Sequence, residues 1–282
     1  MIPAYGNSAM RLNRRVRLIV LAAVIVIALV SLYVAGNGMS DEQLRADFSQ
    51  KALPPSAPHP FGTDLLGRDM LTRTVKGLSL SLFIGVMASC FSALIALITG
   101  IVAASGRTWL DQLINWLIDL TMGIPHTVLL ILISIASGRG LRGLLIGVIV
   151  THWTSLARII RAEVLQLRSR QYVAASRKLG KSGLWIAIHH ILPHLVPQFF
   201  IGLVLLFPHA ILHESMLTFL GFGLPPEQPA IGIILSEAMR YLSAGMWWQA
   251  VFPGLALVLM ALAIDALGEC LKTILDPYSA HE

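Results

Sequence analysis

The sequence predicts an all-α membrane protein with six transmembrane helices. Of its 282 residues, 56% are hydrophobic and 13% are charged, whereas soluble domains contain about 45–50% and about 25% of these classes. Several windows of about 18 or more residues, the length that a helix needs to cross a bilayer, contain no Asp, Glu, Lys or Arg. These observations exclude a water-soluble globular protein.

Six long uncharged stretches give the expected spans. The first follows a basic head, and we interpret it as a start-anchor helix rather than a signal peptide, because no clear small-residue cleavage site follows it and further spans lie downstream. Pro193, Pro197 and Pro208 predict interruptions of the fifth. The spans are residues 18–38, 77–106, 120–138, 143–157, 191–212 with an apolar continuation to 223, and 241–264.

The distribution of basic residues predicts the orientation of the chain. With the amino terminus inside, the inner loops hold 13 of the 21 Lys and Arg residues and the outer loops hold eight. The inner segment 158–181 carries seven of these cations against one acid, Glu163. Because cytoplasmic loops are enriched in Lys and Arg, we expect both termini in the cytoplasm. The net charge of +6 therefore indicates membrane orientation and not a nucleic-acid partner.

These spans and loops predict the organisation of the chain. Four prolines between 54 and 60 favour an extended or turning outer loop, and apolar residues between the basic ones of segment 158–190 favour short amphipathic helices at the membrane face. Cys90 and Cys270 lie in or beside apolar segments and support neither a disulfide framework nor a zinc finger. The expected parts are a cytoplasmic basic tail (1–17), the first transmembrane helix (18–38), an extracytoplasmic loop (39–76), a five-helix core (77–270) containing a cytoplasmic segment (165–190), and a cytoplasmic tail (271–282).

Residues 175–182 match a relaxed Walker pattern, with Ala175 in place of the first glycine. A phosphate-binding loop needs a strand that leads into a glycine-rich turn at the start of a helix. The preceding residues 168–174 do not read as a buried strand, and the sequence offers no soluble α/β domain to contain one. Nucleotide binding by this chain is therefore not expected.

The same region resembles the cytoplasmic EAA loop of bacterial ABC importer permeases. The small-residue core of that loop aligns with 174–176, its glycine with Gly180 and its hydrophobic-Leu-Pro ending with 191–193. Ala174 replaces the family's Glu, so a contact made by that Glu is not expected here. Two short helices broken at a glycine form a compact knob whose small residues let a partner approach. The expected ATPase-coupling residues are Ala174, Ala175, Ser176, Arg177, Lys178, Gly180 and Pro193.

Three further stretches resemble signatures of the peptide/nickel group of these permeases. They are His-Pro-Phe-Gly-Thr-Asp-Leu-Leu-Gly-Arg-Asp at 59–69, Thr-Phe-Leu-Gly-Phe-Gly-Leu-Pro-Pro at 218–226 and Leu-Asp-Pro at 275–277. The resemblance implies the type I ABC importer permease fold in a bacterial inner membrane, surrounded by lipid. It also implies a second homologous permease, two cytoplasmic subunits that bind Mg and ATP and hydrolyse it, and an extracytoplasmic solute-binding protein. No catalytic site and no cofactor are expected in this chain.

Histidines inside the predicted spans are candidates for the translocation pathway. On a helix, His209 and His213 share one face just after Pro208, and their imidazoles could transiently bind a transition metal. His152, His126 beside the Ile-Pro break at 124–125, and Glu214 are expected to join them. The alternative is that these side chains only form hydrogen bonds with neighbouring helices. For Asp119 and Asp265, near span ends, we favour such a structural role.

The sequence indicates the protein family more narrowly than it indicates the transported cargo. The stretch 151–158 and the His-x-x-x-His of 209–213 resemble the nickel branch, which favours nickel or another transition metal, free or chelated, delivered by the binding protein. The alternative within the family is a di-/oligopeptide or opine importer. A remote alternative is an intramembrane metalloprotease, but that chemistry needs His-Glu-x-x-His, and Glu214 follows the second histidine instead of lying between the two.

Overall fold

The computed structural model describes residues 6–105 and 108–275, and in these residues the regular structure is helical. The predicted all-α class is therefore confirmed. Five helices are long and apolar enough to cross a membrane, and the number rises to six if a bent helix pair counts as one span. Asp276, Pro277 and the rest of the predicted tail beyond residue 275 lie outside the described residues, as does Arg107 in the second predicted loop.

The chain divides into two compact units, each described by itself. The first combines residues 1–83 with 218–282, and the second contains residues 84–217. Helices α2 and α8 each continue along the chain from one unit into the other. The long helices are α1 (Gly6–Gly38), α2 (Met70–Ser105), α5 (Leu141–Arg168), α8 (Leu192–Phe219) and α10 (Trp248–Leu275).

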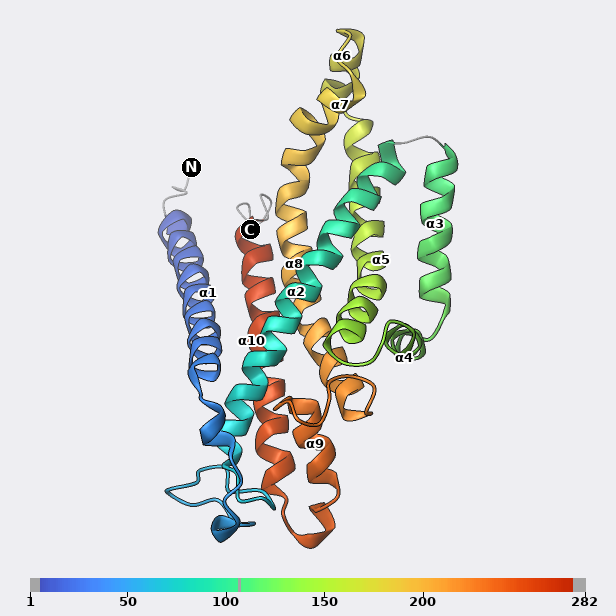
Figure 1. Ribbon diagram of the computed structural model, residues 1–282. Helices are drawn as coiled ribbons and strands as arrows, with labels where there is room; N and C mark the ends of the chain where they lie inside the picture. Colours follow the sequence, from blue (N-terminus) through green and yellow to red (C-terminus); the bar gives the residue numbers. More distant parts are fainter. Residues whose placement is uncertain (1–5, 106–107, 276–282) are drawn as a thin grey trace. The chain divides into compact units, whose positions relative to one another are not determined.

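In the first unit, α1 and α9 (Ile231–Met239) both pack against α10 (Figure 1). Helix α1 already begins at Gly6, so the predicted basic tail 1–17 is helical from that residue onward. Near its end, Gly36 approaches α2 so closely that a Cβ atom would lie 2.4 Å from Ser79 Cβ. From residue 15 onward, where the side chains of α1 are described, most apolar ones are exposed, among them Ile27 and Val34, as expected of a helix bordered by lipid.

The loop between α1 and α2, predicted to be the outer loop, follows a turning path, as its prolines predict. It contains short 3-10 turns at Asp41–Leu44 and Phe48–Gln50 and an isolated bridge between Thr63 and Asp69. Helix α2 begins at Met70 instead of residue 77. The reason is a cap: the Asp69 carboxylate accepts a 2.8 Å hydrogen bond from the Thr72 amide, which stabilises a helix start seven residues before the uncharged stretch.

In the second unit, closely packed helices form the core. Small residues of α2, including Ala93 and Ala96, face the buried side chains of α5. At Gly100, an added Cβ atom would lie 2.9 Å from Ile160 Cβ and 3.0 Å from the Ala157 carbonyl oxygen. The remaining helices of this unit are α3 (Thr108–Gly123), α4 (His126–Ala136), α6 (Gln171–Lys178) and α7 (Gly183–Ile186).

The third predicted span, 120–138, is broken at the Ile-Pro step noted in the sequence, and its first part begins earlier than predicted. Helix α3 ends at Gly123, α4 begins at His126, and the two are bent by 102°. Pro125 explains the break, because it lacks an N–H group and disfavours helical geometry at the preceding residue. Figure 1 shows α4 turned across the direction of α3.

Helix α3 begins before the predicted span because ion pairs neutralise its acids. The Asp111 carboxylate accepts hydrogen bonds from Arg161 Nε at 2.6 Å and from a terminal nitrogen of the same guanidinium at 2.7 Å. Arg158 donates to Asp119 at 2.7 Å, which agrees with the structural role expected for this acid. Both pairs join α3 to α5, so these charges mark a helix contact and not the end of a helix.

Two other predicted boundaries are also corrected. Helix α5 continues eleven residues beyond the predicted end at 157, through the basic stretch to Arg168. The sixth helix begins at Trp248 instead of 241, because residues 242–244 form a 3-10 turn that ends at Gly245 with φ +86°. Helix α8 runs without interruption through Pro197 and Pro208.

Candidate functional site

A pocket of about 810 Å³ lies in the second unit, between the α3–α4 junction, α5 and α8. Apolar residues such as Ile159, Ile201 and Leu205 form much of its wall. The composition resembles that of small-molecule sites, in which a mostly apolar wall carries a few polar groups. Four of the predicted pathway residues line it: His126, His152, His209 and His213.

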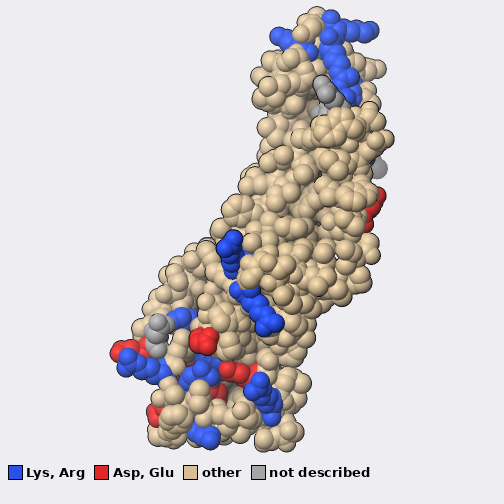
Figure 2. Space-filling view, turned by 45° about the vertical axis from the view of Figure 1, so that its right-hand side comes forward, with Lys and Arg blue, Asp and Glu red and all other residues tan. Residues whose placement is uncertain are grey.

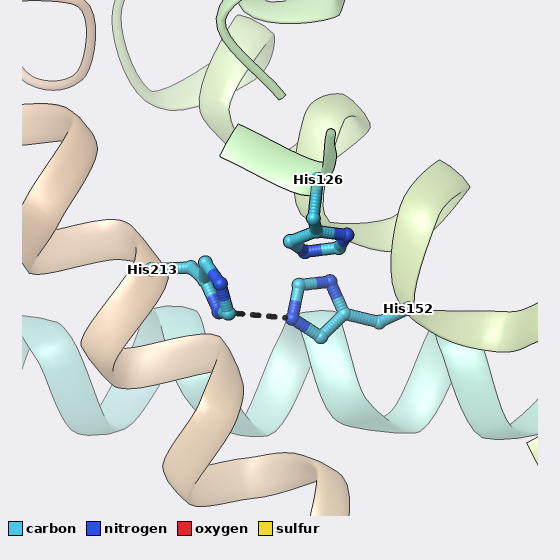
Figure 3. Close-up of side chains that lie close together, drawn as sticks. All are labelled: His126, His152 and His213. Atoms are coloured by element: carbon cyan, nitrogen blue, oxygen red, sulfur yellow. Dashed lines mark hydrogen bonds between the residues drawn. The ribbon is translucent and has the colours of Figure 1, made fainter. Parts of the chain in front are cut away.

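Three of these histidines form a cluster, which we call the histidine triad: His126, His152 and His213. They come from α4, α5 and α8, and Figure 3 shows their rings turned toward one another. The ring centroids lie 4.6 to 5.0 Å apart. One ring nitrogen from each residue can be chosen so that all three lie within 4.8 Å of one another.

The bend between α3 and α4 places the first member of the triad. His126 is the first residue of α4, so its position depends directly on the break at Pro125. His152 is 8% exposed, and His213 is half-buried. Residues from three separate stretches therefore converge on one wall of the pocket.

Backbone carbonyl groups orient two of the rings. His152 Nδ1 donates to the Val148 carbonyl oxygen at 2.9 Å, and His213 Nδ1 donates to that of His209 at 2.8 Å. The Nδ1 of His213 also lies 3.3 Å from His152 Nε2. In contrast, the buried Nε2 atom of His126 has no hydrogen-bond partner among the described residues.

The other two predicted pathway residues differ in position. His209 is exposed, lines the pocket one turn before His213, and donates from Nδ1 to the Leu205 carbonyl oxygen at 3.0 Å. Its ring is not part of the triad, so the expected metal pair of His209 and His213 is not the cluster that the structure brings together. Glu214 is fully buried, accepts a 3.1 Å hydrogen bond from Ser215, and is not among the residues that line the pocket.

The predicted coupling segment forms a knob at one end of the second unit. Helix α6 is followed by Gly180 at φ +76°, then by α7 and a π-helical turn at Ala187–Ile191 that leads into α8. Only Val173 of α6 is buried. Pro193 is exposed in the first turn of α8, where proline is tolerated. The exposed predicted residues of the knob are Ala174, Ala175, Arg177, Lys178 and Gly180.

One hydrogen bond holds α6 against the π-helical turn. Ser176 Oγ lies 2.8 Å from His190 Nε2, and aromatic rings surround this contact. Trp185 stacks on His189 with centroids 4.3 Å apart, and Tyr172 meets the His190 ring edge-on at 5.4 Å. Figure 2 shows Lys and Arg side chains gathered over this end of the chain. Sequence reasoning missed His190, although the His-His pair before the Ile-Leu-Pro ending is visible in the sequence.

The 59–69 signature organises the loop between α1 and α2 in the first unit. Asp64 is buried and accepts hydrogen bonds from the amides of Leu66 and Arg68, at 2.8 and 2.9 Å. It also accepts from the guanidinium groups of Arg68 at 2.6 Å and Arg73 at 2.8 Å. Arg73 extends the network to Glu237 of α9 at 2.8 Å. These signature residues therefore stabilise the loop itself.

Comparison with known proteins shows matches along most of the chain. Residues 96–279 match the family described as "Binding-protein-dependent transport system inner membrane component". The chain is 34% identical over 275 residues to the dipeptide transport system permease protein DppC of Bacillus subtilis (strain 168), covering 97% of this chain and 86% of that protein. It is 37% identical over 267 residues to a peptide transport system permease protein of Brucella suis biovar 1 (strain 1330), covering 95% and 88%.

Two further matches extend this comparison. The oligopeptide transport system permease protein OppC of Bacillus subtilis is 34% identical over 226 residues, covering 79% of this chain and 73% of that protein. Among solved structures, a chain of the inward-facing MetNI methionine ABC transporter superposes with a TM-score of 0.61 at 17% identity, covering 73% of this chain and 98% of that one. This structural likeness concerns the fold.

Proposed function

Because the chain belongs to the family of binding-protein-dependent transport system inner membrane components and has the type I ABC importer permease fold, we propose that it is a permease subunit of a peptide importer. The observation that carries this proposal is the identity of 34–37% along 93–97% of the chain with proteins named as dipeptide or peptide permeases. The sequence favoured nickel as the main cargo; the relatives' names instead favour the alternative, short peptides.

The pocket of the second unit supports a small cargo. Its volume of about 810 Å³ lies within the range of about 300–1,000 Å³ that is usual for small-molecule sites. A peptide of a few residues has both apolar side chains and a polar backbone, which suits apolar walls that carry a few imidazoles. We assign His126, His152, His209 and His213 to the translocation pathway on this basis; Glu214, buried elsewhere, is left out.

The surface of the knob favours docking of a separate subunit that supplies energy for transport. The exposed small residues Ala174 and Ala175 allow close approach of a partner, and Arg177 and Lys178 add positive charge beside them. We propose that this surface contacts one of two ATP-binding subunits, which bind Mg and ATP and hydrolyse it. In this arrangement a second permease completes the membrane part, and an extracytoplasmic binding protein delivers the cargo.

The same arrangement includes an orientation. With the knob in the cytoplasm, the seven Lys and Arg residues of 158–181 obey the positive-inside rule, and both termini lie on the same side in the bacterial inner membrane. Accessibility of a cysteine introduced at Lys178 in intact and in opened cells tests this. Labelling by an impermeant reagent in intact cells contradicts the orientation.

Transport is tested with the complete transporter in proteoliposomes. This chain, its partner permease, both ATP-binding subunits and the binding protein are reconstituted, and uptake of tritiated di- and tripeptides is measured. We expect uptake to require ATP and the binding protein. A complex whose ATP-binding subunits cannot hydrolyse ATP is the control. Absence of peptide uptake from a complex whose ATPase responds to the binding protein contradicts the peptide cargo.

A second candidate cargo is a transition metal, free or chelated, including opine-type chelates. The specific observation in its favour is the histidine triad, whose ring nitrogens lie within 4.8 Å of one another. Uptake of radioactive nickel by the same proteoliposomes, with and without added peptide, separates this cargo from the first. Nickel uptake that needs no peptide favours the metal itself.

A further inference from the structure

The histidine triad has the ligand chemistry of a transition-metal site. Three imidazoles from α4, α5 and α8 meet in one wall of the pocket (Figure 3). Imidazole nitrogen is a favoured ligand of Zn²⁺, Ni²⁺, Co²⁺ and Cu²⁺, and carboxylate oxygen suits Mg²⁺ and Ca²⁺ better. The described residues that line the pocket include histidines and neither Asp nor Glu, so its wall offers nitrogen ligands in place of carboxylate oxygens.

The hydrogen bonds of the triad determine which nitrogens are free to bind an ion. A carbonyl oxygen can only accept, so the Nδ1 atoms of His152 and His213 that face carbonyl groups at 2.9 and 2.8 Å carry the protons. In a neutral ring the lone pair is then on Nε2. Metal-binding histidines show this same arrangement, with the second ring nitrogen donating to a carbonyl or carboxylate. Two of the three rings thus carry their lone pair on Nε2, as metal-binding histidines with such a second partner do.

The third ring supplies an independent observation. His126 Nε2 is buried and has no hydrogen-bond partner among the described residues. A buried polar atom without a partner is costly, about 1–3 kcal/mol, and calls for an explanation in a native structure. A bound ion beside it would give this nitrogen a partner.

The distances require a small adjustment. A metal–nitrogen bond of about 2.0–2.1 Å places tetrahedral nitrogen ligands roughly 3.4 Å apart, whereas one ring nitrogen from each histidine can be chosen so that the three lie within 4.8 Å of one another. Ring rotations that move each nitrogen inward by about an ångström close this difference. The 3.3 Å contact between His152 Nε2 and His213 Nδ1 is long for a hydrogen bond, so little is lost when it is replaced by a bond to the ion.

We propose that His126, His152 and His213 together bind a divalent transition-metal ion that enters the pocket as cargo. Three neutral imidazoles replace three water molecules of the hydrated ion, and no proton is released. The three residues line the pocket of about 810 Å³, which has room for a chelator such as a short peptide beside the ion. This inference rests on the proposed function in one respect, namely that the ion arrives as transported cargo. What it adds is that the histidine triad recognises cargo that contains a metal ion.

Co²⁺ binding to the purified, complete transporter in nanodiscs tests the site without any transport step. Visible d–d absorption reports nitrogen coordination, and titration gives the affinity. We expect one Co²⁺ per copy of this chain, and an affinity at least tenfold weaker in His152→Ala and His126→Ala. Because His152 is buried, assembly of each variant is checked by size exclusion, and the half-buried His126 provides the second, less disruptive variant.

Two other histidines serve as controls for these variants. His194 Nδ1 donates to the carbonyl oxygen four residues earlier at 2.8 Å, as His213 Nδ1 does. Because His194 is not among the residues that line the pocket, His194→Ala leaves Co²⁺ affinity unchanged. His209→Ala, in the pocket but outside the triad, weakens binding far less than His152→Ala. Absence of Co²⁺ binding, or equal affinity in the wild type and in both triad variants, overturns the proposal.

Two probes distinguish a free ion from a chelate. Co²⁺ alone and Co²⁺ premixed with the dipeptide Gly-His are titrated separately; tighter binding of the mixture indicates a chelate, and equal binding indicates the ion.

Uptake of a peptide that binds no metal distinguishes failure of the proposed metal site from failure of the proposed permease function. If that peptide is transported and Co²⁺ does not bind, the site is wrong and the permease function stands. If Co²⁺ binds the triad but no cargo is taken up with ATP, the transport function is wrong.

Discussion

Arg73 donates a 2.8 Å hydrogen bond to Asp64 Oδ2, and the two side chains are only 4% and 6% exposed. This buried pair connects the start of α2 to the 59–69 signature. Removing one partner of a buried pair leaves the other charge less compensated. Arg68 remains 2.6 Å from the same oxygen, which limits the loss.

We therefore expect Arg73→Ala to lower the free energy of unfolding by about 2–3 kcal/mol. Chemical denaturation of the purified chain in detergent measures this. Arg45→Ala is the matched control, because Arg45 and Glu42 form an ion pair whose side chains are 76% and 75% exposed, and exposed pairs contribute less than about 1 kcal/mol. Equal effects of the two variants contradict the structural role of the signature.

The bidentate pair between Arg161 and Asp111 predicts a measurable coupling between α3 and α5. Both carboxylate oxygens are engaged, at 2.6 and 2.7 Å, and this geometry is stronger than a single contact. A double-mutant cycle with Arg161→Ala and Asp111→Ala should give about 1–2 kcal/mol. The same cycle for the more exposed pair of Arg158 and Asp119 should stay below about 1 kcal/mol. A reversed order contradicts the prediction.

Gly180 predicts a backbone requirement in the knob. Its φ of +76° disfavours any side chain, although an added Cβ atom would meet nothing within 4 Å. Gly180→Val should therefore rearrange the turn between α6 and α7 at a cost of about 1–2 kcal/mol, so that less cargo is transported per ATP hydrolysed while the subunit still assembles. Gly183→Val is the control, since Gly183 has equal space and no positive φ. Unchanged coupling in Gly180→Val contradicts this role.

The contact between Ser176 and His190 predicts a role for rigidity in the knob. His190→Ala removes the 2.8 Å hydrogen bond that holds α6, so stimulation of ATP hydrolysis by the binding protein should fall several-fold. His189→Ala removes a neighbouring ring that stacks on Trp185 and leaves this bond in place. Ser176→Ala should reproduce the effect of His190→Ala. If His189→Ala is equally harmful, aromatic packing and not the hydrogen bond is responsible.

Features that depend on local composition were predictable from the sequence. A run of uncharged residues must be buried in lipid or protein wherever it lies, so the spans beginning near 18, 77 and 143 correspond to α1, α2 and α5. Gly180 breaks the knob because few other residues adopt its φ. Boundaries were less accurate where charges are neutralised by partners, as for Asp111 and Asp119 in α3.

Contacts between distant stretches were not predictable in the same way. The pairing of His213 with His209 followed from helical spacing, but the approach of His152 and His126 depends on how α5, α8 and the bent α4 pack. Likewise, Arg73 meets Glu237 across 164 positions of sequence. No periodicity within either stretch contains this information.

The 102° bend at Pro125 links ligand binding by the histidine triad to the angle between α3 and α4. His126 is carried by the helix beyond the bend, whereas His152 and His213 are carried by the long helices α5 and α8. Drawing the three rings around one ligand therefore favours one angle of the bend, and by thermodynamic reciprocity any force that alters that angle alters ligand affinity to the same extent. A change of that angle would therefore alter the affinity of the proposed metal site directly, because His126 immediately follows Pro125.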